Sequence, residues 1–286
     1  MPGLPNFKIM FRALKYRNFR LFIGGQSLSL IGTWVQQIAM TWLVYSITNS
    51  AFMLGMIGFS SQIPMFLLSP IAGVLADRWN RHKVILAIQT ASLIQALILS
   101  VIVLSGHVQV WHLITLSIVL GTISAFDIPV RQSFMFDMLD NNKKDLPNAI
   151  ALNSSMVNST RLIGPSIAGI LISTIGEGWC FALNSLSYVA VIISLLSMKN
   201  IPYLKNSKKT NVLEEMKEGF NYSFGFKPIK YLILLLALVS LMSTPLTLLA
   251  PVFAKDIFHG GASMYGFLMG AFGVGAMFGT VYLLNR

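Results

Sequence analysis

Eight long apolar segments are the feature that most constrains how this chain can fold. They cover residues 19–47, 52–76, 84–105, 110–130, 149–175, 179–198, 231–253 and 264–284. A helix of about 20 apolar residues crosses the hydrocarbon core of a bilayer, and each segment reaches that length. Charged residues make up 11% of the chain, against about a quarter in soluble domains. The sequence therefore predicts an all-α polytopic membrane protein with the lipid bilayer as its solvent.

Basic residues are distributed unevenly between the connections. Of the 21 Lys and Arg, 19 lie near the two ends of the chain or in the second, fourth and sixth connections. Because basic connections stay on the cytoplasmic side, both termini are expected there. A net charge of +11 can also indicate nucleic-acid binding, but no basic face with a readable motif accompanies it. We expect a multi-pass protein of the cell membrane, in a bacterium the inner membrane, without a nucleic-acid partner.

The long sixth connection divides the chain into three parts. Residues 1–198 are expected to form a six-helix N-terminal bundle, 199–230 a cytoplasmic linker, and 231–286 a partial C-terminal bundle of two helices. Within the linker, residues 212–226 carry apolar side chains at helical spacing, which predicts an amphipathic interfacial helix. The segments that open at Ser50 and Gly261 share Ala, Met and Gly at matching positions. That match favours parallel repeats of the kind found in secondary transporters.

The residue patterns of enzymes are missing from the sequence. It contains no G-x-x-x-x-G-K-[ST] phosphate-binding loop. The four histidines are spread over helix ends and connections and are not clustered for a metal. Cys180 is the single cysteine, so the chain has no thiol pair for a disulfide, a metal or redox chemistry. We therefore expect a protein that is not an enzyme and holds no cofactor or metal.

The connection between the second and third segments carries the strongest motif. It reads GVLADRWNRHK from Gly73 to Lys83 and resembles motif A of the major facilitator superfamily, G-x-L-A-D-R-x-G-R-K/R. The resemblance implies a major-facilitator-type bundle, with a complete six-helix N-terminal half and the first two helices of the C-terminal half. It also implies that Asp77 faces the N-terminal dipole of a helix in the second half and locks the outward-facing state. Arg78 and Arg81 would complete this gating motif.

Two details of the motif lead to local expectations. Asn80 replaces the usual glycine, and asparagine accepts the left-handed backbone angles of a tight turn. Gly73 is expected to let the backbone of a neighbouring helix approach closely. The alternative interpretation is that the charges of this connection only set the topology.

A second motif lies in the fifth segment. Gly164, Pro165 and Gly169 resemble motif C, G-x-x-x-G-P-x-x-G-G, which is associated with the exporters of the superfamily. A proline inside a helix removes one backbone hydrogen bond and bends the axis. The glycines make the helix thin for packing against a neighbour. The alternative is an ordinary Gly-Pro kink without a role in transport.

Arg161 is the one basic residue deep inside an apolar segment, away from its ends. Its position is about 18 Å from the start of that segment at 1.5 Å per residue. Because a charge at this depth is costly, it must face the bundle interior or a watery cavity. Gln26, Gln36 and Gln37 of the first segment are candidate partners. These four residues are our candidates for substrate contact or proton coupling, and a buried structural hydrogen-bonding role for Arg161 is the alternative.

Asp127 and Arg131 close the fourth segment. Pro129 between them is expected to end the helix, with Asp127 near the cytoplasmic interface about 26 Å from the external end. The superfamily resemblance implies a charge relay in which Asp127 pairs with Arg78 or Arg81, while Arg131 pairs elsewhere. The alternative to a charge relay is that Asp127 is a charge at the membrane interface whose carboxylate reaches solvent.

The resemblance extends over nearly the whole chain and points to the drug and siderophore exporters, including macrolide-efflux and enterobactin-exporter proteins. Trp42 and Tyr45 are expected in an aromatic belt at the outer interface. Gly266, Gly270, Gly275 and Gly279 form helix-packing pairs in the last segment. These glycines could recruit a protein partner, and the oligomeric state stays open.

Two functions remain open at this stage. The first is a secondary transporter that exports a small amphipathic compound by alternating access, driven by the proton gradient. Its cavity is expected to be apolar and aromatic with a few polar groups. The alternative is a non-transporting membrane protein, cut short after its eighth helix, that acts at most as an interaction partner. Members of the superfamily have twelve spans, so four more helices would be expected after Arg286.

Overall fold

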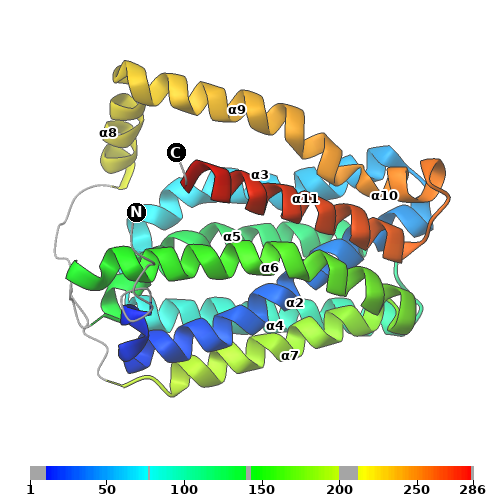
Figure 1. The fold of residues 1–286 in the computed structure, drawn as a ribbon, viewed down its shortest axis with the longest axis horizontal. Helices are drawn as coiled ribbons and strands as arrows, with labels where there is room; N and C mark the ends of the chain where they lie inside the picture. Colours follow the sequence, from blue (N-terminus) through cyan, green and yellow to red (C-terminus); the bar gives the residue numbers. More distant parts are fainter. Residues whose placement is uncertain (1–10, 77, 140–142, 200–211, 285–286) are drawn as a thin grey trace.

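The computed structural model describes residues 11–76, 78–139, 143–199 and 212–284. Within them every regular element is helical (Figure 1). The long helices are α2 (Arg17–Thr48), α3 (Ala51–Ala76), α4 (Arg81–Leu104), α5 (Val110–Asp137), α6 (Leu146–Ile175), α7 (Glu177–Leu196), α8 (Val212–Gly225), α9 (Lys227–Leu248) and α11 (Ala262–Leu284). Shorter turns are η1 (Arg12–Lys15), η2 (Lys143–Asp145), α10 (Ala250–Val252) and the π-helix η3 (Phe253–Ile257). The predicted all-α class is confirmed.

Two helix ends differ from the prediction, and proline is involved in both. Pro129 was expected to end the fourth span, but α5 continues to Asp137. A membrane helix can tolerate such a proline because neighbouring groups satisfy the freed carbonyl. The segment 231–253 was expected to be one helix, yet α9 ends at Leu248 and α10 and η3 follow. Pro245 and Pro251 lie on either side of this break, and each lacks the N–H that a continuous helix needs.

The membrane-spanning character varies among the helices. Within the described residues, α3, α4, α5, α7 and the stretch 227–257 are long and apolar enough to cross a bilayer. The helices α2 and α6 have 32 and 30 residues, but they fall outside this set. Both carry many amide and hydroxyl side chains, and α6 also carries Arg161. The polar residues that reduce the hydropathy of α2 include several that line the cavity described below, whereas α6 contributes no residue to that lining.

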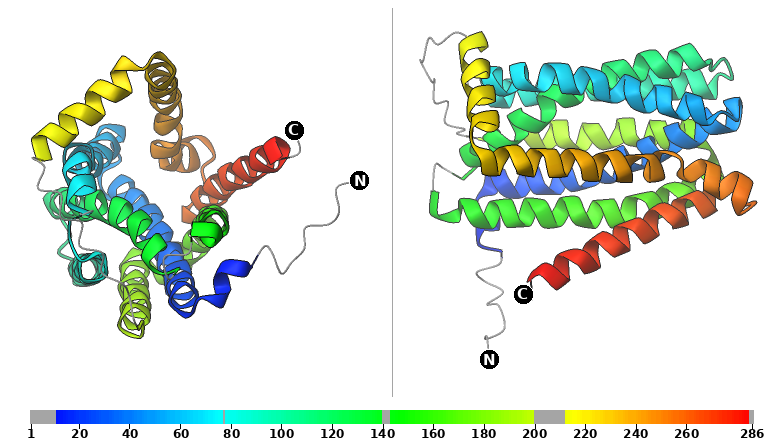
Figure 2. Two further views of the ribbon diagram at one scale, coloured as in Figure 1. Left: turned by 90° about the vertical axis from the view of Figure 1, so that its left-hand side faces the viewer. Right: turned by 90° about the horizontal axis from the view of Figure 1, so that it is seen from above.

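Helices α2 to α7 pack side by side as a bundle (Figures 1 and 2). α2 contacts α6 and α7, α4 contacts α5 and α7, and α3 lies along α5. At one end, which we call the short-turn end, residues 49–50, 105–109 and 176 connect the helices. We call the opposite end the basic end, because residues 77–80 and 138–145 connect the helices there and the arginine and lysine clusters lie nearby.

Two apolar clusters and a polar layer make up the bundle interior. One cluster includes Phe19, Phe22 and Phe134 near the basic end. The other includes Val35 and Leu43 toward the short-turn end. Between them, α2 presents amide and hydroxyl side chains, and further buried amides come from α4 and α7. Buried polar groups need hydrogen-bond partners, so this layer is where a functional site is expected.

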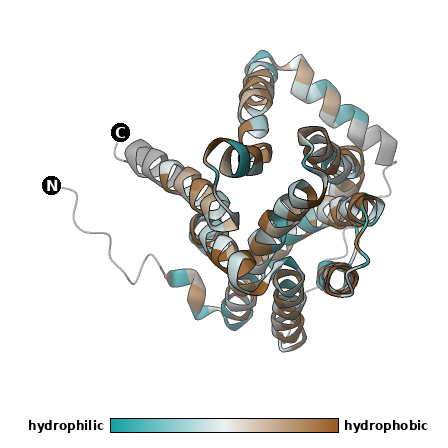
Figure 3. Ribbon diagram, turned by 90° about the vertical axis from the view of Figure 1, so that its right-hand side faces the viewer, coloured by the Kyte–Doolittle hydropathy of each residue, from teal (hydrophilic) through white to brown (hydrophobic). Residues whose placement is uncertain are grey.

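The segment after α7 is less enclosed. α8 is helical over the segment in which an amphipathic interfacial helix was predicted, and Figure 3 shows hydrophilic positions along it against mostly apolar bundle helices. α9 buries none of its residues within the described structure. α11 packs along α6, and its C-terminal end diverges from α6 toward the basic end (Figure 2). The α10 segment contacts α2 at the short-turn end.

Candidate functional site

A cavity of about 340 Å³ lies in the polar layer. Its walls come from α2, α3, α4, α5 and α7, with Leu248 of α9 at its edge. The polar side chains on its walls are Gln26, Ser29, Thr33, Gln36, Gln37, Thr41, Ser61, Gln62, Gln89, Ser92, Ser117, Ser124, Asp127, Arg131 and Tyr188. Tyr188 is the one aromatic residue among the described lining residues, so the expected aromatic lining is wrong. The volume lies in the range of small-molecule sites.

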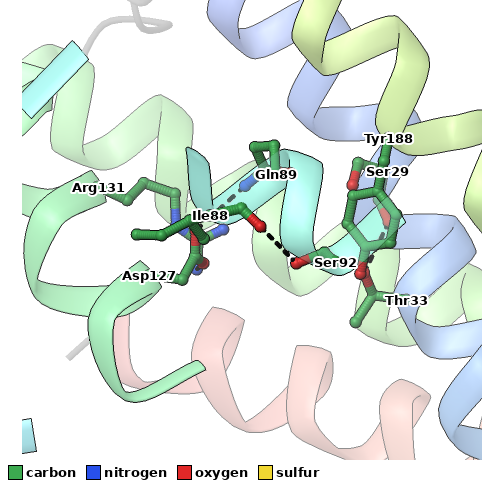
Figure 4. Close-up of polar contacts among 8 residues, drawn as sticks. All are labelled: Ser29, Thr33, Ile88, Gln89, Ser92, Asp127, Arg131 and Tyr188. Atoms are coloured by element: carbon green, nitrogen blue, oxygen red, sulfur yellow. Dashed lines mark hydrogen bonds and ion pairs between the residues drawn. The ribbon is translucent and has the colours of Figure 1, made fainter. Parts of the chain in front are cut away.

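The charged groups of the cavity form one short network. Arg131 Nη2 lies 3.1 Å from Asp127 Oδ2, and each of these side chains is 18% exposed. Gln89 on α4 donates from Nε2 to Asp127 Oδ1 over 3.2 Å. Figure 4 shows the three side chains converging from α4 and α5. The carboxylate is therefore held by a cation on one oxygen and an amide on the other.

This pairing corrects the predicted charge relay. Arg131, not Arg78 or Arg81, is the ion-pair partner that the structure gives Asp127. Because α5 continues through Pro129, Arg131 stands one helical turn after Asp127 on the same face.

Arg81 instead binds a carboxylate that sequence reasoning missed. Its Nη1 donates to both oxygens of Asp137, over 3.0 and 3.2 Å, at the basic end. Its Nε also donates to the carbonyl of Ala76. Asp137 is 5% exposed and ends α5. The available signal was an acidic residue inside the otherwise apolar run from Phe134 to Leu139.

The three glutamines expected to accompany Arg161 all line the cavity. Gln36 is fixed by the core, because its Nε2 donates to Gln95 Oε1 over 3.0 Å and its Oε1 accepts from Asn184 Nδ2 over 2.7 Å. Gln26 differs, since its buried Oε1 has no hydrogen-bond partner among the described residues. The same is true of Gln89 Oε1. An unpaired buried acceptor costs about 1–3 kcal/mol.

Tyr188 of α7 forms the other polar wall of the cavity, and the sequence had not marked it. Its hydroxyl lies 3.4 Å from the hydroxyl of Thr33, which donates to its own helix at Ser29. Ser92 lies between this pair and the charged group (Figure 4), with its hydroxyl donating to the carbonyl of Ile88. Hydroxyl and amide groups thus line the wall between the two sides of the cavity.

Arg161 lies outside the cavity lining. Its side chain is exposed, and its guanidinium carbon lies 5.9 Å from the centroid of the Trp34 ring. The expected partnership with Gln26, Gln36 or Gln37 is therefore corrected to a cation–π contact. Gly164 explains the change, because a Cβ there would lie 2.5 Å from Trp34 Cβ. Because Gly164 has no side chain, the Trp34 side chain of α2 can lie against α6 at this position.

The glycines of motif C make the close contacts that the sequence predicts. A Cβ on Gly169 would lie 2.8 Å from the Cα of Gly266 on α11. Gly270 and Gly273 also face α6, whereas a Cβ on Gly275 would meet nothing within 4 Å. The packing face of α11 thus runs through Gly273 and leaves out Gly275. Gly266 and Gly270 already contact α6, so they are not a free surface for a protein partner.

The motif A connection only partly follows expectation. Asp77 lies outside the described residues, and a Cβ on Gly73 would meet nothing within 4 Å. The close helix approach predicted for Gly73 is therefore wrong within the described structure. Asn80 is not left-handed, with φ −67° and ψ 99°; its side chain accepts from Lys83 N and caps α4. An N-cap of this kind satisfies a backbone donor that the helix leaves free. The side chain of Lys83 is exposed.

At the short-turn end, α2 is joined to the segment after α9. The hydroxyl of Tyr45 donates to Asp256. Lys255 Nζ donates to Asn49 Oδ1 over 2.6 Å and lies 5.5 Å from the centroid of the Tyr45 ring. Tyr45 is 3% exposed, and Trp42 stacks on Tyr265 at 6.1 Å. The aromatic belt predicted for Tyr45 and Trp42 is wrong, because both rings pack against the later helices.

Similarity to known proteins agrees with this architecture. The family model described as transmembrane secretion effector matches residues 10–285. The staphyloferrin A transporter of Staphylococcus aureus is 26% identical over 92% of this chain and 66% of its own length. The macrolide efflux protein A of Streptococcus pyogenes is 24% identical over 91% of this chain and 68% of its own. The enterobactin exporter EntS of Escherichia coli is 25% identical over 91% of this chain and 60% of its own.

A solved structure shows the same fold. It is a bacterial homologue of the human lysosomal transporter Spinster in an inward-facing, unoccupied conformation, with a TM-score of 0.71 at 18% identity. The match covers 93% of this chain and 61% of that one. The chain spans 66%, 68% and 60% of the length of the three curated relatives named above. It belongs to the transmembrane secretion effector family of major facilitator transporters, which are membrane proteins and not enzymes.

Proposed function

We propose that this chain exports a small amphipathic compound by alternating access, with protons as the driving ion. The observation that carries the proposal is the Asp127–Arg131 ion pair on the wall of the cavity. A carboxylate there can exchange protons with the compartment to which the cavity opens. Its charge state can then determine which contacts hold α4 and α5 together.

The chemistry of one proton supports this coupling. Ionised Asp127 holds Arg131 and accepts from Gln89. Protonation removes the negative charge, so the guanidinium is released and the charge of the cavity wall rises by one. A partly exposed ion pair contributes up to about 1 kcal/mol. An interaction of that size can be broken and formed again in each cycle, as a transport switch requires.

The arrangement of the helices supports alternating access. We infer that the basic end is cytoplasmic, because the basic connections gather there. At the opposite end, Tyr45 of α2 binds Asp256, and Asn49, the C-cap of α2, binds Lys255. α11 diverges from α6 toward the basic end (Figure 2). These features fit an inward-facing state in which residues 1–198 and 231–286 belong to two halves, joined through 199–230.

Export is the direction that the sequence and the relatives favour. Gly164, Pro165 and Gly169 match the exporter motif; Pro165 and Gly169 lie against α11, and Gly164 lies against Trp34 of α2. The relatives include a macrolide efflux protein and an enterobactin exporter. By this likeness, a drug- or siderophore-like compound is the proposed substrate, and a bacterial cell membrane the proposed location. The Arg161–Trp34 contact adds a candidate cationic contact outside the cavity.

The test is accumulation of an ethidium- or macrolide-type compound in cells that express the chain. We expect lower accumulation than in control cells, and an uncoupler should remove the difference. Asp127→Asn should abolish export, while Glu177→Gln, the same change outside the cavity, should leave it intact. Unchanged accumulation with and without uncoupler would contradict transport by this chain and favour a non-transporting membrane protein.

A further inference from the structure

Two amide oxygens on the cavity wall are left without donors. Gln26 and Gln89 are each 3% exposed, and Oε1 of each has no hydrogen-bond partner among the described residues. The Gln89 amide cannot be rotated by 180° to exchange its oxygen and nitrogen, because its Nε2 donates to the Asp127 carboxylate. Its oxygen therefore remains an acceptor.

The three residues that carry these groups lie at similar distances from the basic end of the bundle. Gln26 lies nine residues after the start of α2, and Gln89 eight residues after the start of α4. Asp127 lies ten residues before the end of α5. At 1.5 Å per residue these positions are about 14, 12 and 15 Å from the basic end of their helices. All three line the same cavity.

The charged and polar groups around Gln26, Gln89 and Asp127 favour a ligand that donates hydrogen bonds and disfavour an anionic ligand. Arg131 is the one cation among the described lining residues, and it is already bound to Asp127. A carboxylate has about four acceptor positions, so Arg131 and Gln89 do not saturate it. A ligand carboxylate would meet two amide oxygens and a like charge there.

We propose that Gln26, Gln89 and Asp127 form a subsite for a primary or secondary ammonium group of the transported compound. Such a group supplies two or three N–H donors and one positive charge, which matches two unpaired oxygens beside a carboxylate. The apolar body of the ligand would lie against Leu30, Leu54 and Ile57 on the same walls. This inference rests on the proposed function, because it names the group by which the transported compound is recognised.

Three matched probes separate the possible head groups. They are 2-phenylethylamine, 2-phenylethanol and phenylacetate, which share a ring and differ in carrying an ammonium, a hydroxyl or a carboxylate. The measurement is the thermal unfolding midpoint of the purified chain in detergent, followed by tryptophan fluorescence at millimolar probe concentrations. The amine should raise the midpoint in a saturable way, and the alcohol and the acid should not.

Variants assign the effect to the subsite. Gln26→Met and Gln89→Met keep an unbranched side chain and remove the acceptor, so each should weaken amine binding about tenfold or more. Gln132→Met is the matched control, because Gln132 is exposed and is not among the lining residues. Gln26→Met tests the subsite even if Gln89→Met disturbs Asp127 and prevents folding.

Each outcome bears on the proposal. No amine shift, an equal shift with the alcohol or the acid, or unchanged amine binding in Gln26→Met would overturn the ammonium subsite. Transport of another class of compound could still be observed in those cases. Amine binding that depends on the glutamines, without any uncoupler-sensitive transport, would support the subsite and contradict the proposed function.

Discussion

Arg81 at the start of α4 binds the carboxylate of Asp137 at the end of α5. Its Nη1 donates to both oxygens, over 3.0 and 3.2 Å. Both side chains are largely buried. The pair fixes two neighbouring helices to each other at the basic end, directly beside the motif A connection. Removing one partner leaves a buried charge without compensation, which is more costly than removing both.

The first prediction concerns this pair. Arg81→Ala should destabilise the folded chain by about 3 kcal/mol, because Asp137 then loses its counter-charge. The thermal unfolding midpoint in detergent measures the effect. The double variant Arg81→Met with Asp137→Leu should recover much of the loss, and Lys83→Ala, at an exposed position on the same helix, should cost little. A single variant as stable as the parent would show that the pair contributes nothing.

The second prediction concerns the contact between α6 and α11. A Cβ on Gly266 would lie 2.6 Å from the Cα of Gly169, so Gly266→Ala should destabilise the chain by about 1–3 kcal/mol. Gly275→Ala on the same helix meets nothing within 4 Å and should stabilise slightly through helix propensity. Opposite shifts of the unfolding midpoint are therefore expected. Equal shifts in the two variants would contradict the close packing.

The third prediction concerns the short-turn end. Tyr45→Phe removes the hydroxyl that donates to Asp256, and should favour separation of α2 from the segment after α9. Spin labels at Thr48 and His259 would report a larger share of long distances. Thr174→Val, which removes an exposed hydroxyl bonded within its own helix, is the control. An unchanged distance distribution in Tyr45→Phe would show that this hydrogen bond does not hold the end closed.

The fourth prediction concerns the N-terminal arm, by which we mean η1 (Arg12–Lys15) and Tyr16, and its contact with the start of α6. Lys15 Nζ lies 2.7 Å from Asp145 and Arg12 Nε lies 2.7 Å from the same carboxylate. The hydrogen bond from Lys15 is the main cause that lowers the pKa of Asp145 below 3.8, and a second one from Tyr16 adds to it. The same contact raises the pKa of Lys15 above 10.5.

These shifts define the pH range in which the arm stays docked. The contribution of Asp145 is complete above about pH 4 and is lost as the pH falls through the lowered folded pKa. That of Lys15 is complete below pH 10.5 and is lost as the pH rises through the raised one. The amide of Ala13, which donates to Asn148 Oδ1, reports docking through hydrogen exchange corrected for its intrinsic rate. Asp145→Asn should speed that exchange at neutral pH, and Glu177→Gln should not. An Ala13 amide that exchanges at the same rate in Asp145→Asn would contradict the role of the ion pairs.

Much of the architecture followed from the sequence because membrane helices are determined locally. Apolar runs of about 20 residues locate the helices. Seven of the eight segments correspond to one helix each, and the segment 231–253 is divided between α9, α10 and η3. The amphipathic helix α8 and the close glycine contacts of motif C also follow from local patterns. Such features depend on spacing within one helix, which can be read without knowing its neighbours.

Only the tertiary structure decided which polar groups meet. Asp127 binds Arg131 because α5 runs on through Pro129. Arg81 reaches Asp137, and Arg161 meets Trp34 outside the cavity. Each outcome depends on where one helix ends and how its faces are turned toward other helices. The sequence by itself determined the helices and placed Gln26, Gln36 and Gln37 among the candidates, whereas the relative rotation of the helices decided that these three share a cavity with Asp127 and that Arg161 does not.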